Sequence, residues 1–442
     1  MTRVDDLKKK ILPYRKQEEL LDKWLVDRLD NILPKVMKRS GIDAWVVACN
    51  EYNEDPVLKS LVPCAMMTAR RLTILLFHLD GNKVNRYALT RPNVGLDDIY
   101  ESVWTNPKGS NWADKKSLMP FGKNDNKNSA PLETQMECLN RMLKQCDPKK
   151  IGINVSKTFA FADGLSHNLY EQIMAALDED LKERIVSAEN LCVGWLETRS
   201  KDEMEAYNGI MEIAHQLIAD AFSSKVVIPG VTTNADVKYF MLEKCVELGL
   251  QPWFDFEVSI RRANVGEVSG VDVIRPGDIL HCDVGFRYLN LCTDTQENAY
   301  VLKLGETDAP EELKEVMRTV NRLQDITIGN FKAGRSGNEI LALSLKQAKE
   351  EGIVPCIYTH PIGYHGHAAG PTIGLWDMQG GVPGGGDYLM YDDTAYSLEL
   401  NCKCEVKSWN ITLTFGAETD VLFTGGKTYY LAHRQDSFHL IK

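Results

Sequence analysis

The chain has 442 residues and a net charge of −11, with 44% hydrophobic and 26% charged residues. This length predicts two or three domains, and the composition is that of a globular protein rather than a disordered or fibrous one. An acidic balance argues against binding to nucleic acid or to an anionic membrane, because both require a basic surface.

The N-terminal stretch and the cysteines indicate a compartment. The first 24 residues carry charges throughout, without the apolar core or cleavage site of a secretory signal. The longest apolar runs, such as 72–77, are far shorter than the roughly 20 residues of a membrane span. The eleven cysteines are odd in number and scattered, which favours reduced thiols. We therefore expect a cytoplasmic protein.

Residues 1–195 predict a mixed α/β domain. The apolar positions of 15–39 recur with helical spacing and end at Ser40-Gly41. Asp80-Gly81-Asn82 lies between two apolar runs and predicts a hairpin. The expected elements are a helix over 15–39, strands over 42–48, 72–79, 84–89 and 151–155, and a long polar surface loop over 104–132.

Residues 196–442 predict a second domain. It opens with an amphipathic helix over 197–223, whose start is marked by Ser200 and by Glu203 three positions later, the pattern of a capping box. The further expected elements are helices over 234–249, 309–331 and 336–351, and strands over 253–259, 279–288, 298–303, 395–402, 409–415 and 418–424.

Two aspartates stand close together in RPGDILHCDVGFRYLNLCTDTQENAYVL, residues 275–302. Asp283 ends an apolar strand, and Asp294 follows eleven residues later. On neighbouring strands of a hairpin, the two carboxylates can converge on one point. Either aspartate alone is also explained as a residue of a turn or loop.

Histidines cluster in THPIGYHGHAAGPTIGLWD, residues 359–377. His360, His365 and His367 lie within eight residues of a chain that holds only nine histidines. Glycines around them allow close approach to a ligand, and neutral imidazole is a common metal ligand. A single histidine would more often be structural, so the clustering is what indicates a site.

Two glutamates interrupt apolar strands, Glu399 in AYSLELN and Glu418 in GAETDVLF. An unpaired glutamate facing a core is costly, although each could instead face solvent. Four carboxylates and an imidazole would form an oxygen-rich site suited to two Mn²⁺, Fe²⁺, Co²⁺ or Zn²⁺ ions. Carboxylates bridge such ions at about 3.5–4 Å, and a hydroxide shared by them would be the nucleophile.

These segments together resemble the creatinase/aminopeptidase P/prolidase/methionine aminopeptidase family of pita-bread fold. RPGDILHCDVG resembles the family's strand with its first metal aspartate, and Gly366-His367-Ala368-Ala369-Gly370 resembles its G-H-x-x-G. The resemblance implies a creatinase-type N-terminal domain, a C-terminal pita-bread domain and two divalent ions, Mn²⁺ foremost. It implies a homodimer, with 104–132 reaching toward the partner. The implied metal ligands are Asp283, Asp294, His367, Glu399 and Glu418.

The chain departs from the family in residues that contact the substrate. Peptidases of the family have a histidine about 17 residues before the first metal aspartate, where this chain has Gly266. A second histidine follows the metal histidine by seven, which counted from His367 is Gly374. Gly416 replaces an arginine two residues before the last metal glutamate, and Gln296 replaces a common threonine.

Three functions stay open on this basis. The first is an Xaa-Pro aminopeptidase or prolidase acting on small peptides, with Glu399 as proton shuttle and His360, His365 or His281 in place of the missing histidines. The second is a non-peptidase enzyme of the same fold acting on another small molecule, as creatinase and the dimethylsulfoniopropionate lyases are. The third is a catalytically silent binding protein. Whether His365 or His367 binds metal also stays open.

Overall fold

The computed structural model describes residues 7–91, 95–104 and 132–442, so the predicted polar loop over 104–132 lies almost wholly outside the described residues. The chain divides into two compact units. One is Glu18–Leu196, and the other is Glu197–Lys442 together with the described residues before Glu18. In the described part of the chain, no helix is long and apolar enough to cross a membrane.

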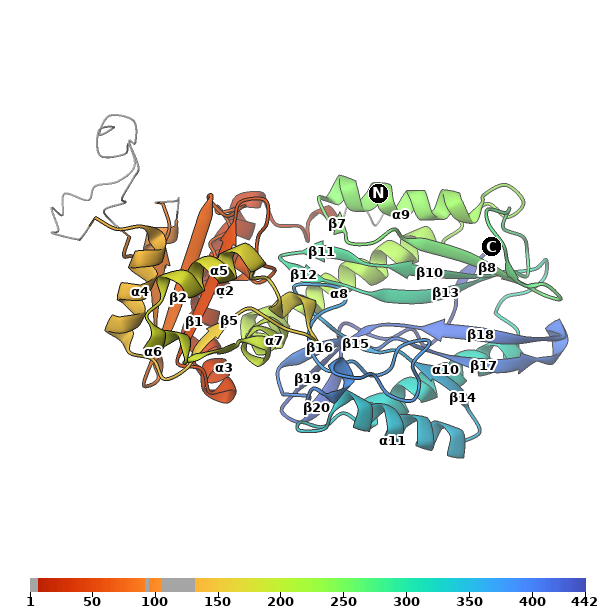
Figure 1. Cartoon of the computed structure of the whole chain (residues 1–442). Coiled ribbons are helices and arrows are strands. Elements are labelled where there is room, and N and C mark those ends of the chain that lie inside the picture. Colours follow the sequence, from red (N-terminus) through yellow and green to blue (C-terminus); the bar gives the residue numbers. More distant parts are fainter. Residues whose placement is uncertain (1–6, 92–94, 105–131) are drawn as a thin grey trace. The chain divides into compact units, whose positions relative to one another are not determined.

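The N-terminal unit is built on a six-stranded sheet (Figure 1). The predicted hairpin is confirmed, and Gly81 adopts the positive φ of +60° that its turn requires. The first strand pairs antiparallel with the second and parallel with the fifth. The strand order is β4 (Glu101–Ser102), β3 (Lys83–Leu89), β2 (Leu72–Asp80), β1 (Ala44–Asn50), β5 (Ile151–Ile153) and β6 (Ile185–Ser187).

Helices complete this unit. The helix predicted over 15–39 is instead two, because Pro34 cannot donate a backbone hydrogen bond to the preceding turn. The second of them ends at Gly41 (φ +64°), as predicted. Leu139 and Ile173 of two later helices share a buried core with the central strands. The helices are α2 (Tyr14–Asn31), α3 (Leu33–Ser40), α4 (Gln135–Cys146), α5 (His167–Ala176), α6 (Glu179–Lys182) and α7 (Glu189–Glu197).

The C-terminal unit contains four sheets flanked by helices (Figure 1). The five-stranded sheet has the order β21 (His439–Ile441), β13 (Thr295–Val301), β10 (Ile279–Val284), β8 (Glu257–Arg262) and β9 (Gly266–Val268). The four-stranded sheet is β15 (His360–Ile362), β16 (Thr394–Ser397), β19 (Asp420–Thr424) and β20 (Lys427–Tyr430). The others are β14 (Val354–Ile357), β17 (Leu400–Val406) and β18 (Ile411–Ala417), and β12 (Leu291–Cys292), β11 (Phe286–Tyr288) and β7 (Gln251–Pro252).

Two pairs of helices cover these sheets from opposite sides (Figure 1). α8 (Lys201–Ala221) and α9 (Asn234–Leu248) lie against the five-stranded sheet, and α10 (Glu311–Gly329) and α11 (Gly337–Glu350) lie against β14, β17 and β18. The predicted capping box is present at α8, where Ser200 accepts from the backbone of Glu203 and the Glu203 side chain accepts from Ser200. The mixed architecture confirms the predicted α/β class.

One predicted strand, 395–402, is divided in the structure. β16 ends at Ser397 and pairs with β19, whereas β17 starts at Leu400 and pairs with β18. The segment that pairs with these strands is divided at the same level, since β18 ends at Ala417 and β19 starts at Asp420. The two strands therefore pass together from one sheet into another. Glu399 and Glu418 lie in these two breaks.

Candidate metal centre

Three carboxylates from three places in the sheets converge. Asp283 lies near the end of β10, Asp294 directly precedes β13, and Glu418 lies between β18 and β19. One oxygen from each lies within 4.8 Å of the other two. The backbone holds this arrangement, because Asp283 pairs with Gln296 across β10 and β13, and the Gln296 amide donates to the Glu418 carbonyl at 3.2 Å.

Glu399 extends the cluster toward a histidine. Ligand atoms of Glu399, Glu418 and His360 lie within 4.8 Å of one another. The backbone carbonyl of Glu399 accepts from the Tyr358 amide at 3.2 Å and from the Thr359 hydroxyl at 3.0 Å. The strand break that carries Glu399 is thus fixed by the segment that leads to His360.

The pKa of each of the four carboxylates is raised, and burial is the largest cause in each case. Burial, and then the charge of Glu257, raises the pKa of Asp283 to about 7, and burial and Asp283 raise that of Glu399 to about 8. Burial and the neighbouring carboxylates raise the pKa of Asp294 and of Glu418 well above its ordinary value. A buried cluster of carboxylates is stable in its ionised form only if positive charge lies among the carboxylate oxygens.

The histidine closest to these carboxylates is His360. Its Nε2 lies 3.6 Å from Asp294 Oδ2 and 3.9 Å from Glu399 Oε2. Its Nδ1 lies 2.9 Å from the Pro361 carbonyl, to which it can donate. Burial, and then His367, lowers the pKa of His360 to about 4, so the ring is neutral. An imidazole held through Nδ1–H offers its Nε2 lone pair to a metal.

His367 and His365 lie differently. His367 is exposed and forms a possible metal-ligand group with Asp294 and His360. Its ring centroid is 4.7 Å from that of His360. It also packs edge-on against Trp253, with centroids 5.2 Å apart. His365 belongs to no possible metal-ligand group in the described part of the chain. Counted from His360, the family's seven-residue spacing leads to His367.

Three residues at the centre were not predicted as site residues. Gln296 donates from Nε2 to Asp283 Oδ2 at 3.3 Å and to Glu399 Oε1 at 2.7 Å. The Ser397 hydroxyl donates to Glu418 Oε1, and the buried Asp420 accepts from the Asp294 backbone at 3.3 Å. The sequence offered one signal, which is that Gln296 follows Asp294 by two residues on a strand and so faces the same side.

The space beside Gly416, where the family has an arginine, is filled by Gln296 and His281. A Cβ at Gly416 would lie 3.0 Å from Gln296 Oε1 and 3.3 Å from His281 Cε1. His281 is held by Asn298, with Nδ1 and Oδ1 3.0 Å apart. Burial, and then Arg261, lowers the pKa of His281 to about 3. Arg261 is buried too, and its Nη1 has no hydrogen-bond partner in the described part of the chain.

The side chains fit a divalent-metal site. Asp283 Oδ1, Glu418 Oε2 and His360 Nε2 are buried, and none has a hydrogen-bond partner among residues 7–91, 95–104 and 132–442. Buried polar atoms in native proteins are nearly always satisfied. Oxygen donors with one imidazole are a donor set for Mn²⁺, Fe²⁺, Co²⁺ or Zn²⁺.

Comparison with known proteins found a matching family model and similar solved structures. Residues 205–399 match the model of Metallopeptidase family M24. The structure is similar to X-Pro aminopeptidase from Thermotoga maritima, with a TM-score of 0.58, 17% identity, and coverage of 92% of this chain and 99% of that one. It is similar to Xaa-Pro dipeptidase from Bacillus anthracis, with a TM-score of 0.58, 16% identity, and coverage of 94% and 100%. No curated protein matches the sequence.

The match and the shared fold confirm the resemblance to the creatinase/aminopeptidase P/prolidase family. The matched segment runs from α8 to Glu399 and includes both aspartates and all three clustered histidines. Since the identities are low, the structural likeness concerns the fold.

Proposed function

We propose that this chain is a divalent-metal-dependent hydrolase of the Xaa-Pro aminopeptidase or dipeptidase type. The observation that carries the proposal is the convergence of Asp294, Glu399 and Glu418 on the neutral imidazole of His360, with Asp283 grouped with Asp294 and Glu418. The shared fold with an X-Pro aminopeptidase and an Xaa-Pro dipeptidase supports the substrate class.

In this proposal the four carboxylates and His360 hold two ions. The sequence favoured His367 as the imidazole ligand, but the buried Nε2 of His360 is the better candidate because it approaches two of the carboxylates. His367 is exposed beside it and would contact the substrate. Ions in such a site polarise a scissile carbonyl and lower the pKa of a water molecule.

The protein groups would then handle the proton and the substrate. Glu399 lies among the candidate metal ligands, and its carboxylate would take a proton from water and pass it to the leaving amine. His367 would donate to the substrate carbonyl or amide. The buried guanidinium of Arg261 is the candidate partner for a peptide carboxylate, in place of the arginine replaced by Gly416.

A second candidate is an enzyme of the same fold that acts on another small molecule. It is favoured by Gly266 and Gly416, which stand where peptidases of the family have a histidine and an arginine. With His360 as the ligand, the departure at Gly374 disappears, because His367 then supplies the histidine seven residues after the metal histidine.

A turnover screen distinguishes these candidates. The Mn²⁺-loaded protein is assayed on Xaa-Pro dipeptides and tripeptides, on the same peptides with alanine in place of proline, and on creatine-like and sulfonium compounds. Release of the N-terminal residue from Xaa-Pro substrates alone supports the first proposal. Turnover of creatine or a sulfonium compound without peptide cleavage supports the second.

We further propose a cytoplasmic homodimer. None of the eleven cysteines forms a disulfide within the described part of the chain, as in a reducing compartment. Light scattering at micromolar concentration tests the assembly against the chain mass of 49.8 kDa. A mass near that of one chain would contradict it.

A further inference from the structure

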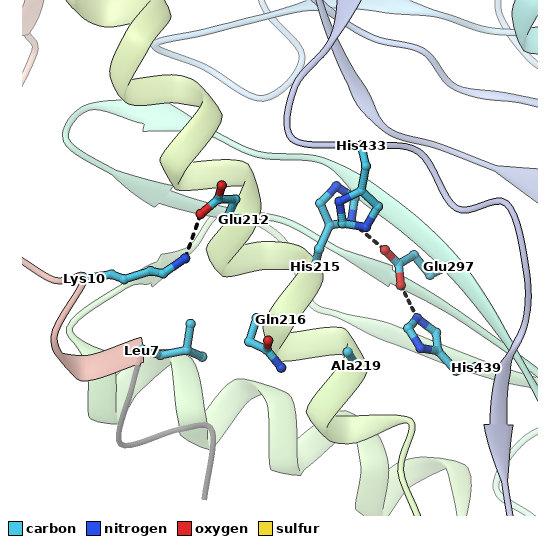
Figure 2. A pocket seen from close by; sticks show the side chains of 9 residues that line it. All are labelled: Leu7, Lys10, Glu212, His215, Gln216, Ala219, Glu297, His433 and His439. Carbon is cyan, nitrogen blue, oxygen red and sulfur yellow. Dashed lines mark hydrogen bonds and ion pairs between the residues drawn. The ribbon is translucent and has the colours of Figure 1, made fainter.

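A second cluster of histidines lies on the other face of the five-stranded sheet (Figure 2). Successive residues of a strand point to opposite faces, so Gln296 faces the carboxylates described above and Glu297 faces α8. Glu297 is only 2% exposed. Its carboxylate is hydrogen-bonded to the imidazoles of His215 on α8 and of His439 at the start of β21.

The contacts in this cluster are close. His215 Nδ1 lies 2.5 Å from Glu297 Oε1, and His439 Nε2 contacts the other oxygen, Oε2. His433, from the segment between β20 and β21, packs on His215 with ring centroids 4.0 Å apart. One ligand atom each from His215, Glu297 and His433 lies within 4.8 Å of the other two.

The electrostatics favour a cation here. Burial raises the pKa of Glu297, but hydrogen bonds from His215 and His439 outweigh it and lower the pKa to about 2, so the group is an anion. Burial, and then the neighbouring His215, lowers the pKa of His433. A neutral His433 ring offers a nitrogen lone pair beside the Glu297 carboxylate.

The cluster also opens into a pocket of about 440 Å³ (Figure 2). The cation at its rim, Lys10, is paired with Glu212 at 2.7 Å, so it does not neutralise Glu297. His215 Nε2 is buried and has no hydrogen-bond partner within the described ranges of the chain. A buried nitrogen without a partner, beside an anion and two further imidazoles, is the arrangement of a metal site.

We propose that His215, Glu297, His433 and His439 bind one further divalent transition-metal ion of the Zn²⁺ type. The donor set is rich in nitrogen, whereas the first centre is rich in oxygen, so this site prefers Zn²⁺ or Ni²⁺ over Mn²⁺. The ion would join α8, β13 and the C-terminal segment, and its role is structural. Seven of the nine histidines then belong to the two centres or their surroundings, and only His78 and His167 lie in the N-terminal unit.

Zn²⁺ counting tests the proposal. The full-length protein and two variants are saturated with Zn²⁺, freed of excess metal and analysed for metal per chain. His433→Ala removes an exposed side chain and so leaves the fold intact. We expect it to bind one Zn²⁺ fewer than the native protein. His167→Ala, which removes another exposed histidine, is the matched control and should bind as much as the native protein.

A second background separates the two centres. Asp283→Asn with Glu418→Gln disables the first centre, and we expect one Zn²⁺ per chain to persist and to raise the unfolding temperature. Adding His433→Ala, or His215→Asn, which preserves a side-chain N–H donor, should abolish both effects. Equal Zn²⁺ content with and without His433, in either background, would overturn the proposal. Failure of the peptidase proposal would leave these comparisons unchanged.

Discussion

The side-chain amide of Gln296 donates to Oε1 of Glu399 at 2.7 Å. The same nitrogen reaches Asp283 Oδ2 at 3.3 Å, so one amide joins a carboxylate of β10 to one in the break between β16 and β17. This donor lowers the pKa of Glu399, although burial and then Asp283 still raise it to about 8. Gln296 therefore orients Glu399 and favours its ionised form.

Gln296→Leu should weaken metal binding. Leucine occupies a similar volume but donates no hydrogen bond, so protons compete better with metal for Glu399. Loss of a group that orients a ligand typically costs about 10–100-fold in metal affinity. Titration of both proteins with Mn²⁺ measures the metal affinity. Gln347→Leu, which removes an amide donor to Glu351 at 3.1 Å on α11, is the control, and equal affinities in the two variants would contradict the role of Gln296.

Glu399→Gln should abolish turnover and leave the fold intact. The amide preserves the shape of the side chain but neither accepts a proton nor supplies an anionic ligand. Loss of general-base function alone typically costs about 10²–10⁴-fold, and a weaker metal site adds to it. Steady-state kinetics and metal content are measured together. Glu405→Gln, an exposed substitution on β17, should retain native activity, and native activity in Glu399→Gln would refute the shuttle.

The sequence predicted the elements that depend on local patterns. The hairpin at Gly81 and the capping box of α8 follow from turn and cap residues alone. The break at Ser397 was not predicted, because AYSLELN alternates as one strand and the division arises only when 394–397 and 400–406 pair with different partners.

The histidine assignment shows a limit of motif matching. The pattern G-H-x-x-G occurs only at Gly366–Gly370 and selected His367, although the shorter pattern H-x-x-G also occurs at His360–Gly363. Distance to Asp294 and Glu399 distinguishes them, and it is a property of the assembled sheets. The cluster around Glu297 was missed for the same reason, since its histidines are isolated in sequence and meet only in the fold.

The metal-free protein should lose stability as pH rises. The pKa of Glu399 is about 8 and that of Asp283 about 7, whereas unfolded carboxyls titrate near 4. Between these values the folded state holds more protons than the unfolded state, so the free energy of unfolding falls as pH increases. We expect the unfolding temperature in EDTA to decrease from pH 5.5 to 8.5, and Mn²⁺ to reverse this above about pH 7.

A variant isolates the groups responsible. Asp283→Asn with Glu399→Gln removes both titrations, so its unfolding temperature in EDTA should vary less with pH over the same range. Calorimetry on both proteins gives the two slopes. An unchanged slope in the variant would show that the pH dependence arises elsewhere in the chain.

Three histidine variants test the ligand assignment. His360→Ala should lose metal and activity together, because it removes the buried Nε2 that lies 3.6 Å from Asp294 and 3.9 Å from Glu399. His367→Ala should retain its metal and lose about 10²–10⁴-fold in turnover if the exposed ring donates to the substrate. His365→Ala should be the mildest, since it lies outside the ligand groups of the described residues.

Elemental analysis and steady-state kinetics on the same three preparations separate the roles. Metal loss in His367→Ala with full metal in His360→Ala would restore the assignment made from the G-H-x-x-G pattern. Metal loss confined to His365→Ala would contradict both assignments. Equal loss in His360→Ala and His367→Ala would make both rings ligands, which their centroid separation of 4.7 Å and their common group with Asp294 permit.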